Sequence, residues 1–129
     1  MRSLLLLIFL STSSLAQQSL EDSYERGQMI YVDFCLRCHL SDGTGESGVI
    51  PPLAKADFLQ DVKATVHSIK YGIHGPIIVN GVKYNGSMAP MGLENDEIAD
   101  ITNYILNSWG NKSDEIVTEA NVHEIKETK

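Results

Sequence analysis

Two thiols and an imidazole stand close together in the sequence Cys35-Leu36-Arg37-Cys38-His39. On a helix, Cys38 lies about 60° to one side of Cys35 and His39 about 40° to the other, because each residue advances by about 100°. All three side chains therefore leave a helix end within one stripe, from which two sulfurs and one nitrogen can reach the same flat group. A Cys-x-x-Cys-His sequence is the signature of c-type haem attachment, in which the sulfurs bond to the haem and the imidazole binds its iron.

Three other chemistries use two cysteines at this spacing. A thioredoxin-like redox pair is expected near a βαβ pattern, which the sequence does not show. Zinc would need two further ligands, and His67, His74 and His123 match no zinc spacing. A structural disulfide, common in exported proteins, explains the thiols but leaves His39 as a coincidence. The sequence therefore favours one covalently attached haem over these alternatives.

The elements that must position this motif are predicted from helical periodicity. A first helix is expected over residues 21–38, where aromatic and apolar side chains recur every three or four positions. A second is expected over 57–71 with Asp57 as its N-cap, and a third over 95–110 with Asn95 as its N-cap. We therefore expect the motif at the end of the first helix, with two later helices available to cover the haem.

Between the last two predicted helices the sequence changes character. The β-branched runs on either side of Asn80-Gly81 predict a small hairpin or a tight loop. Glycines and a proline are too dense over residues 85–92 for regular structure, so an irregular loop is expected there. Residues 111–129 form a polar tail in which Thr118 can cap a short helix. Whether this tail packs on the domain or frays is left open.

Residues 1–16 are predicted to be a signal peptide. A basic start at Arg2 precedes the apolar run Leu4–Leu10, and small residues precede a cleavage site after Ala16. The run is well short of the ~20 residues that a membrane-spanning helix needs, so an uncleaved anchor is the less favoured alternative. We expect an exported chain that begins near Gln17, has no membrane span and resides in the periplasm of a Gram-negative bacterium.

The composition is acidic and excludes one class of partner. The chain has 17 Asp and Glu against 10 Lys and Arg, a net charge of −7 at pH 7. Nucleic-acid binding is not expected, because it needs a basic footprint. The negative charge can steer the protein towards a basic docking surface, although an ordinary acidic surface without a steering role explains it as well.

The mature chain resembles class I, or monohaem, cytochromes c. Gly27, Tyr31 and Cys35 keep the four-residue steps of that family's first helix, and Ile101 and Tyr104 look like the matching pair on its last helix. A glycine lets two backbones cross closely, and a tyrosine fills the space beside them. The resemblance implies an all-α fold, the cytochrome c fold, with three or four helices around one covalently bound haem and room for a small hairpin. It implies a cytochrome c domain over residues 17–110.

The resemblance also implies a second axial ligand. The sequence Tyr84–Pro90 is similar to the family's Tyr-Asn-Gly-x-Met-Pro loop, so Met88 is expected to bind the iron opposite His39. Ala89 stands where a proline usually follows the methionine, and Met91 therefore stays an alternative.

Other residues have lesser parts in the predicted site. In the family a proline carbonyl holds the second ring nitrogen of the ligand histidine, and this position maps onto Pro51. His74 could in principle reach the iron from its glycine-rich turn, Met29 is expected in the core, and His67 and His123 at the surface. The expected haem lining is apolar: Ile50, Leu53, Leu59, Val62, Ile69, Ile98, Ile101 and Ile105.

Protein ligands on both faces of the iron would leave no position for a substrate, which predicts an electron carrier rather than an enzyme. We also expect the mature protein to be soluble and monomeric. The last predicted helix looks like that of cytochrome domains found beside copper nitrite reductases. This resemblance implies redox partners such as a terminal oxidase, a nitrite reductase or a dehydrogenase. The alternative function is a haem sensor or enzyme whose sixth coordination site is open or labile.

Overall fold

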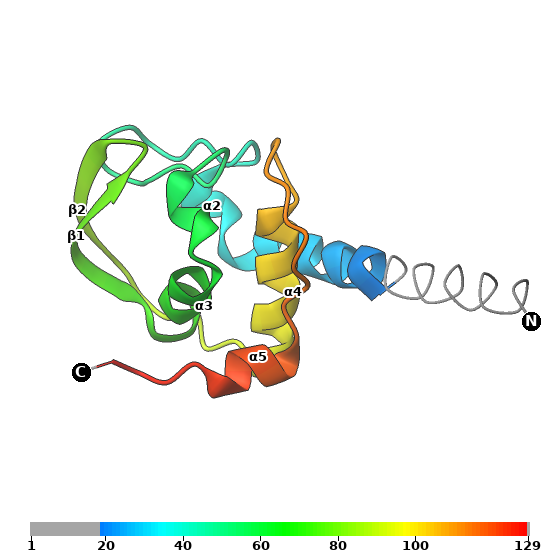
Figure 1. The fold of residues 1–129 in the computed structure, drawn as a ribbon. Helices are drawn as coiled ribbons and strands as arrows, with labels where there is room; N and C mark the ends of the chain where they lie inside the picture. The colour runs from blue at the N-terminus through cyan, green and yellow to red at the C-terminus, as the bar shows by residue number, and fades with distance from the viewer. Residues whose placement is uncertain (1–18, 129) are drawn as a thin grey trace, which may run out of the picture.

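The computed structural model describes residues 19–128, so the predicted signal peptide lies outside the described residues. The N-terminal helix covers residues 19–34. The elements that follow it (Figure 1) are α2 (Leu36–His39), the 3-10 helix η1 (Asp57–Gln60), α3 (Val62–Tyr71), β1 (Ile73–Val79), β2 (Val82–Met88), α4 (Asn95–Leu106) and α5 (Glu119–Glu124). The described fold is mostly helical, and β1 and β2 form one small antiparallel sheet. Within this part of the chain, no helix is both long and apolar enough to cross a bilayer.

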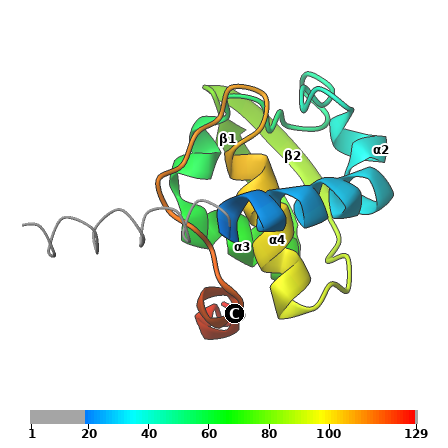
Figure 2. The same ribbon diagram turned by 90° about the vertical axis from the view of Figure 1, so that its right-hand side faces the viewer.

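The N-terminal helix crosses α4 (Figure 2). Gly27 lies at the contact between the two helices. A Cβ at Gly27 would collide with the backbone carbonyl of Asp100 and would lie 2.7 Å from the Cβ of Tyr104. One turn further on, Tyr31 is 1% exposed, and its ring centroid lies 5.3 Å from that of Tyr104. Glycine is thus the residue that allows the two backbones to touch, with aromatic rings filling the space beside the contact.

Polar groups fasten the same crossing. Asp100 is 8% exposed and accepts hydrogen bonds from Nε and Nη2 of Arg26 at 2.6 and 2.9 Å, and from Ser23 Oγ at 2.6 Å. The hydrogen bond from Arg26 to this carboxylate raises the pKa of Arg26. Because a buried carboxylate is costly without such donors, these contacts favour one register between the two helices.

The second predicted helix begins later than its sequence indicated. Its N-cap is Asp61, whose carboxylate accepts a hydrogen bond from Ala64 N at 2.9 Å, and not Asp57. Asp57 instead faces the hairpin turn: it accepts from Asn80 N at 2.7 Å and donates from its own N to Asn80 Oδ1 at 2.9 Å. Asn80, which is distant in the sequence, therefore binds the Asp57 side chain that the local sequence predicted to be a helix cap.

The helix α4 differs from its prediction at both ends. Glu94 caps it rather than Asn95, because Glu94 and Glu97 each accept a hydrogen bond from the other's backbone in a capping box. The helix stops at Leu106, earlier than predicted, and Trp109 beyond it has a φ of +53° that an α-helix does not accommodate.

The predicted hairpin is present and is longer than expected. Its register pairs Ile73 with Met88 at the open end. Residues 85–88 therefore belong to β2, although their composition predicted an irregular loop over 85–92. Pairing with β1 supplies backbone hydrogen bonds to this segment and so stabilises a strand that its local propensity does not favour. Only the segment 89–94 remains without regular structure between β2 and α4.

The polar tail packs against the domain. Asn103 on α4 donates from Nδ2 to Val117 O at 2.9 Å and accepts from Val117 N at 2.8 Å. Thr118 caps α5 as predicted, Val122 is fully buried, and Lys70 on α3 donates to Val122 O at 2.8 Å. The tail is thereby fixed to both α3 and α4, in agreement with the position of α5 in Figure 1.

Replacing Val122 with alanine is expected to lower the free energy of unfolding by about 2 kcal/mol, because two buried methyl groups are lost and a cavity remains. Urea unfolding followed by circular dichroism measures the change. Val32→Ala is the matched control, since Val32 is also helical but 56% exposed. Equal stabilities of the two variants would show that the docked tail contributes nothing to the fold.

Candidate functional site

The two cysteines lie at the end of the N-terminal helix. Backbone hydrogen bonds from Cys35 N to Tyr31 O and from His39 N to Cys35 O, both 2.9 Å, carry helical geometry across Cys35 into α2. Both thiols are free, Cys35 half-buried and Cys38 exposed. The Cys-x-x-Cys-His side chains thus leave a single helix end, and the two sulfurs are not joined in a disulfide.

The imidazole of His39 is held by one hydrogen bond. The residue is 9% exposed, and Nδ1 lies 3.1 Å from the carbonyl oxygen of Pro51. A carbonyl can only accept, so Nδ1 carries the proton and Nε2 keeps its lone pair. Burial lowers the pKa of His39, and the hydrogen bond to Pro51 opposes this shift in part. A neutral, oriented imidazole is the form that binds a metal.

The Cys35 thiol is not activated. Burial, with a smaller contribution from the neighbouring Cys38, raises the pKa of Cys35 to about 11. Catalytic and redox-exchanging cysteines have lowered pKa values, because the thiolate is the reactive form. This environment does not suit a thioredoxin-like pair and leaves a thiol available for a covalent bond made once, during maturation.

A glycine loop holds the Pro51 carbonyl in place. Gly45 N donates to His39 O at 3.1 Å, and Leu53 N donates to Gly43 O at 2.7 Å. Gly45 has a φ of +61°, and a Cβ there would lie 2.7 Å from the Pro51 oxygen. A side chain at this position would push Pro51 away from His39, so the glycine is needed for the orientation of the imidazole.

An apolar cavity opens beside His39. Its wall contains both cysteines, His39, Met88 and Met91. A second hollow shares Cys38, His39 and both methionines, and we call the two together the crevice. Apolar side chains complete the wall of the larger hollow: Phe58, Leu59, Ile69, Ile73, Ile77, Val79 and Ile105.

The crevice does not suit a bare metal ion. Among residues 19–128, no three His, Cys, Asp or Glu side chains are grouped so that they could hold one. One imidazole with apolar surroundings instead suits a metal whose remaining ligands come from a macrocycle.

Comparison with known proteins agrees with this geometry. The sequence model of the family described as cytochrome c matches residues 24–109. The chain belongs to the cytochrome c family. It is 36% identical over 115 residues to a cytochrome c-552 of Thermus thermophilus, an alignment that covers 84% of this cytochrome and 72% of that protein. The resemblance to class I cytochromes c is confirmed, and the cofactor is covalently bound haem c with its iron.

Other relatives of this cytochrome are parts of larger proteins. It is 32% identical over 106 residues to the cytochrome c subunit of a quinone alcohol dehydrogenase from Gluconacetobacter polyoxogenes, covering 79% of this chain but 22% of that subunit. It is 30% identical over 110 residues to the gluconate 2-dehydrogenase cytochrome c subunit of Pantoea cypripedii, an alignment that covers 81% of this chain and 25% of that subunit. The similarity therefore extends over one domain of these longer subunits.

The residues of the crevice fit a haem. Two free thiols, an imidazole with an uncommitted Nε2 and two thioethers border the same space. Thiols form thioether bonds with vinyl groups, while imidazole and thioether are ordinary axial ligands of haem iron. The donor set is thus complete for a covalently attached, six-coordinate haem.

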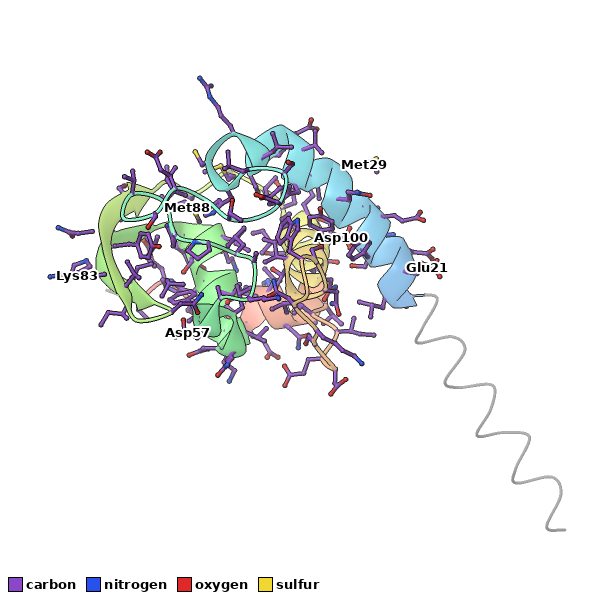
Figure 3. The ribbon with its side chains drawn as sticks, turned by 90° about the horizontal axis from the view of Figure 1, so that it is seen from above. Glu21, Met29, Asp57, Lys83, Met88 and Asp100 are labelled. Atoms are coloured by element: carbon purple, nitrogen blue, oxygen red, sulfur yellow. The ribbon has the colours of Figure 1, made fainter. Side chains whose placement is uncertain are left out.

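Both methionines considered as the second ligand border the crevice. Met88 ends β2, Met91 follows in the irregular segment, and each is half-buried. Met29, in contrast, is 64% exposed and lies on the outer side of the N-terminal helix, away from Met88 (Figure 3), so its predicted place in the core is wrong. His74 is exposed on β1, where its Nδ1 lies 2.9 Å from Ser87 Oγ, and it does not border the crevice.

The predicted lining was correct only in part. Val62, Ile98 and Ile101 do not border the crevice: Ile98 and Ile101 belong to the hydrophobic core, and Val62 packs against that core. The hairpin also contributes to the wall through Ile73 and Ile77, which point inward and were not among the predicted lining residues. The apolar residues Ile73, Ile77 and Val79, all an even number of positions apart, are the sequence signal that could have revealed it.

Proposed function

We propose that Cys35 and Cys38 bond to the haem, that His39 and Met88 bind its iron, and that the Pro51 carbonyl orients His39, so that the protein carries single electrons. The observation that supports this assignment is the crevice itself, where both thiols, the held imidazole and the methionine sulfurs border one apolar space. Membership of the cytochrome c family supports electron transfer as the broad function.

The chain sets the chemistry through its ligands and walls. Bound haem supplies a one-electron couple between ferric and ferrous iron. His39 would bind the iron through Nε2 while Nδ1 stays on the Pro51 carbonyl, and the Met88 thioether would be the second protein ligand, leaving no position for a substrate. Apolar side chains exclude water and disfavour the extra positive charge of the ferric state, as the soft thioether also does. We infer a positive reduction potential from these two effects.

We propose exported redox proteins as the partners. Residues 1–16 as a signal peptide would place the carrier in a periplasm, and the acidic composition would favour a partner with a basic docking surface. Two relatives are cytochrome c subunits of dehydrogenases, which supports a dehydrogenase as the donor; an oxidase or a nitrite reductase would then act as the acceptor.

The test uses protein matured in a host that attaches haem. The expected result is a red protein that keeps its colour after acid-acetone extraction, shows the weak far-red band of methionine-ligated ferric haem, and does not promptly bind carbon monoxide when ferrous. A protein that loses its haem on extraction would contradict the thioether assignment. Prompt carbon monoxide binding by the wild type would favour a sensor or an enzyme instead.

A further inference from the structure

The turn of the hairpin is fastened to the segment before α3 by three hydrogen bonds. Asn80 N donates to the Asp57 carboxylate at 2.7 Å, and Asp57 N donates to Asn80 Oδ1 at 2.9 Å. Asn80 Nδ2 also donates to Lys55 O at 3.2 Å. We call the reciprocal pair of Asp57 and Asn80 the latch. It joins two segments that are 23 residues apart in the chain.

The latch lies at the end of the hairpin that is opposite to Met88. Strand pairing runs from Val79 and Val82 beside the turn to Ile73 and Met88 at the open end. The chain is also held closely at the open end, because a Cβ at Gly72 would lie 2.6 Å from Met88 O. Each end of the hairpin is therefore fixed by a specific contact.

Between these two ends the hairpin faces the crevice. The side chains that border the crevice from it are Ile73, Ile77, Val79, Tyr84 and Met88. Among the elements α2 to α5, β1 contacts η1 more than any other outside the hairpin, and η1 begins at Asp57. A two-stranded sheet is only marginally stable by itself, so the hairpin keeps its place over the crevice through the contacts at its ends.

We propose that Asp57 and Asn80 are positioning residues for the second axial ligand: while the latch is closed, the hairpin keeps the Met88 sulfur in the crevice. This inference rests on the proposed function, in which Met88 binds the iron. When the latch opens, the hairpin moves away from η1 and Met88 moves with it. A soft thioether is a weak ligand for ferric iron, so the population of the open form sets how easily another ligand takes its place.

The strength of the latch suits a contact that opens and closes. Both of its residues are exposed. Their hydrogen bonds are exchanged with water on opening, so each adds only modest net stability. Loss of one of these hydrogen bonds therefore changes the population of the open form without unfolding the domain.

Imidazole binding to the ferric, haem-loaded protein measures the open form, because imidazole reaches the iron only after the methionine has left it. The titration is followed by the loss of the far-red methionine band. Asp57→Ala removes the acceptor of Asn80 N, and the imidazole dissociation constant is expected to fall about fivefold, as for the loss of one exposed hydrogen bond. Asp57→Asn loses the charge but keeps an acceptor oxygen, so its constant should stay within about twofold of the wild-type value.

Asp61→Ala is the matched control. Asp61 is also an exposed carboxylate that accepts a hydrogen bond from a backbone nitrogen, that of Ala64 at 2.9 Å. It caps α3, and among residues 19–128 it makes no hydrogen bond to the hairpin. This variant loses the same charge and a comparable hydrogen bond, so it reports any effect of charge or of general stability. Its imidazole dissociation constant should equal that of the wild type.

An imidazole dissociation constant in Asp57→Ala equal to that of the wild type would overturn the proposal. Equal falls in all three variants would overturn it too, since charge or overall stability, and not the latch, would then control the ligand. A wild type that shows the methionine band, with an Asp57→Ala variant that binds imidazole no more tightly, contradicts only this inference. A wild type without attached haem or without the methionine band contradicts the proposed function.

Discussion

Met88→Ala is expected to convert the ferrous protein into one that binds carbon monoxide promptly. Met88 borders the same crevice as His39, and its loss would leave one face of the iron without a strong protein ligand. The reduction potential should fall by on the order of 0.1 V, a fraction of the ~0.8 V that axial ligands span. Carbon monoxide titration followed by absorption, together with redox titration, measures both effects.

Met91→Ala is the matched control, because Met91 borders the same space and is also half-buried. This variant should keep the far-red band and should not bind carbon monoxide. The reverse result, with the iron opened by the change at Met91 alone, would transfer the ligand assignment to Met91. If neither single variant binds carbon monoxide, each sulfur can replace the other, and only the double variant would open the site.

Gly27→Ala is expected to lower the free energy of unfolding by about 3 kcal/mol, at the upper end of the usual cost of overpacking. The new Cβ would overlap the backbone carbonyl of Asp100, and neither helix can move without disturbing the Arg26 and Ser23 hydrogen bonds to the same residue. Alanine's better helix propensity recovers only about 1 kcal/mol. Urea unfolding of the mature protein measures the difference.

Gln28→Ala is the control for this effect. Gln28 follows Gly27 on the same helix, but it is exposed and does not border the crevice. Its change in stability is expected to stay within about 0.5 kcal/mol, as for substitutions away from packed contacts. Equal stability of the Gly27 and Gln28 variants would show that the two helices can separate enough at their crossing to accept the new Cβ.

The parts of this cytochrome that could be predicted from sequence depend on residues close together in the chain. The Cys-x-x-Cys-His spacing indicates haem attachment because three side chains within two helical turns share a face whatever surrounds them. The hairpin turn at Asn80-Gly81 could be predicted because asparagine and glycine tolerate the positive φ that such turns require. Both residues adopt it in the structure, at +53° and +78°. Gly27 at the helix crossing could be predicted from its four-residue spacing to Tyr31 and Cys35, which resembles that of the first helix in the family. The choice of Met88 over Met91 stays a prediction, since both sulfurs border the crevice.

Other features depend on contacts between distant residues. Asp57 caps no helix because Asn80 binds its carboxylate, and residues 85–88 are a strand because β1 lies beside them. The tail packs because Asn103 meets both backbone groups of Val117.

Sequence by itself determined the cofactor and its attachment, because a covalent motif needs only local geometry. Tertiary structure alone decided which side chains line the crevice, because the hairpin, α3 and α4 form one cavity only after strand pairing and helix crossing bring them together. Backbone hydrogen bonds and apolar burial between residues far apart in the sequence contribute more to the free energy of folding than the local conformational preferences that sequence patterns report.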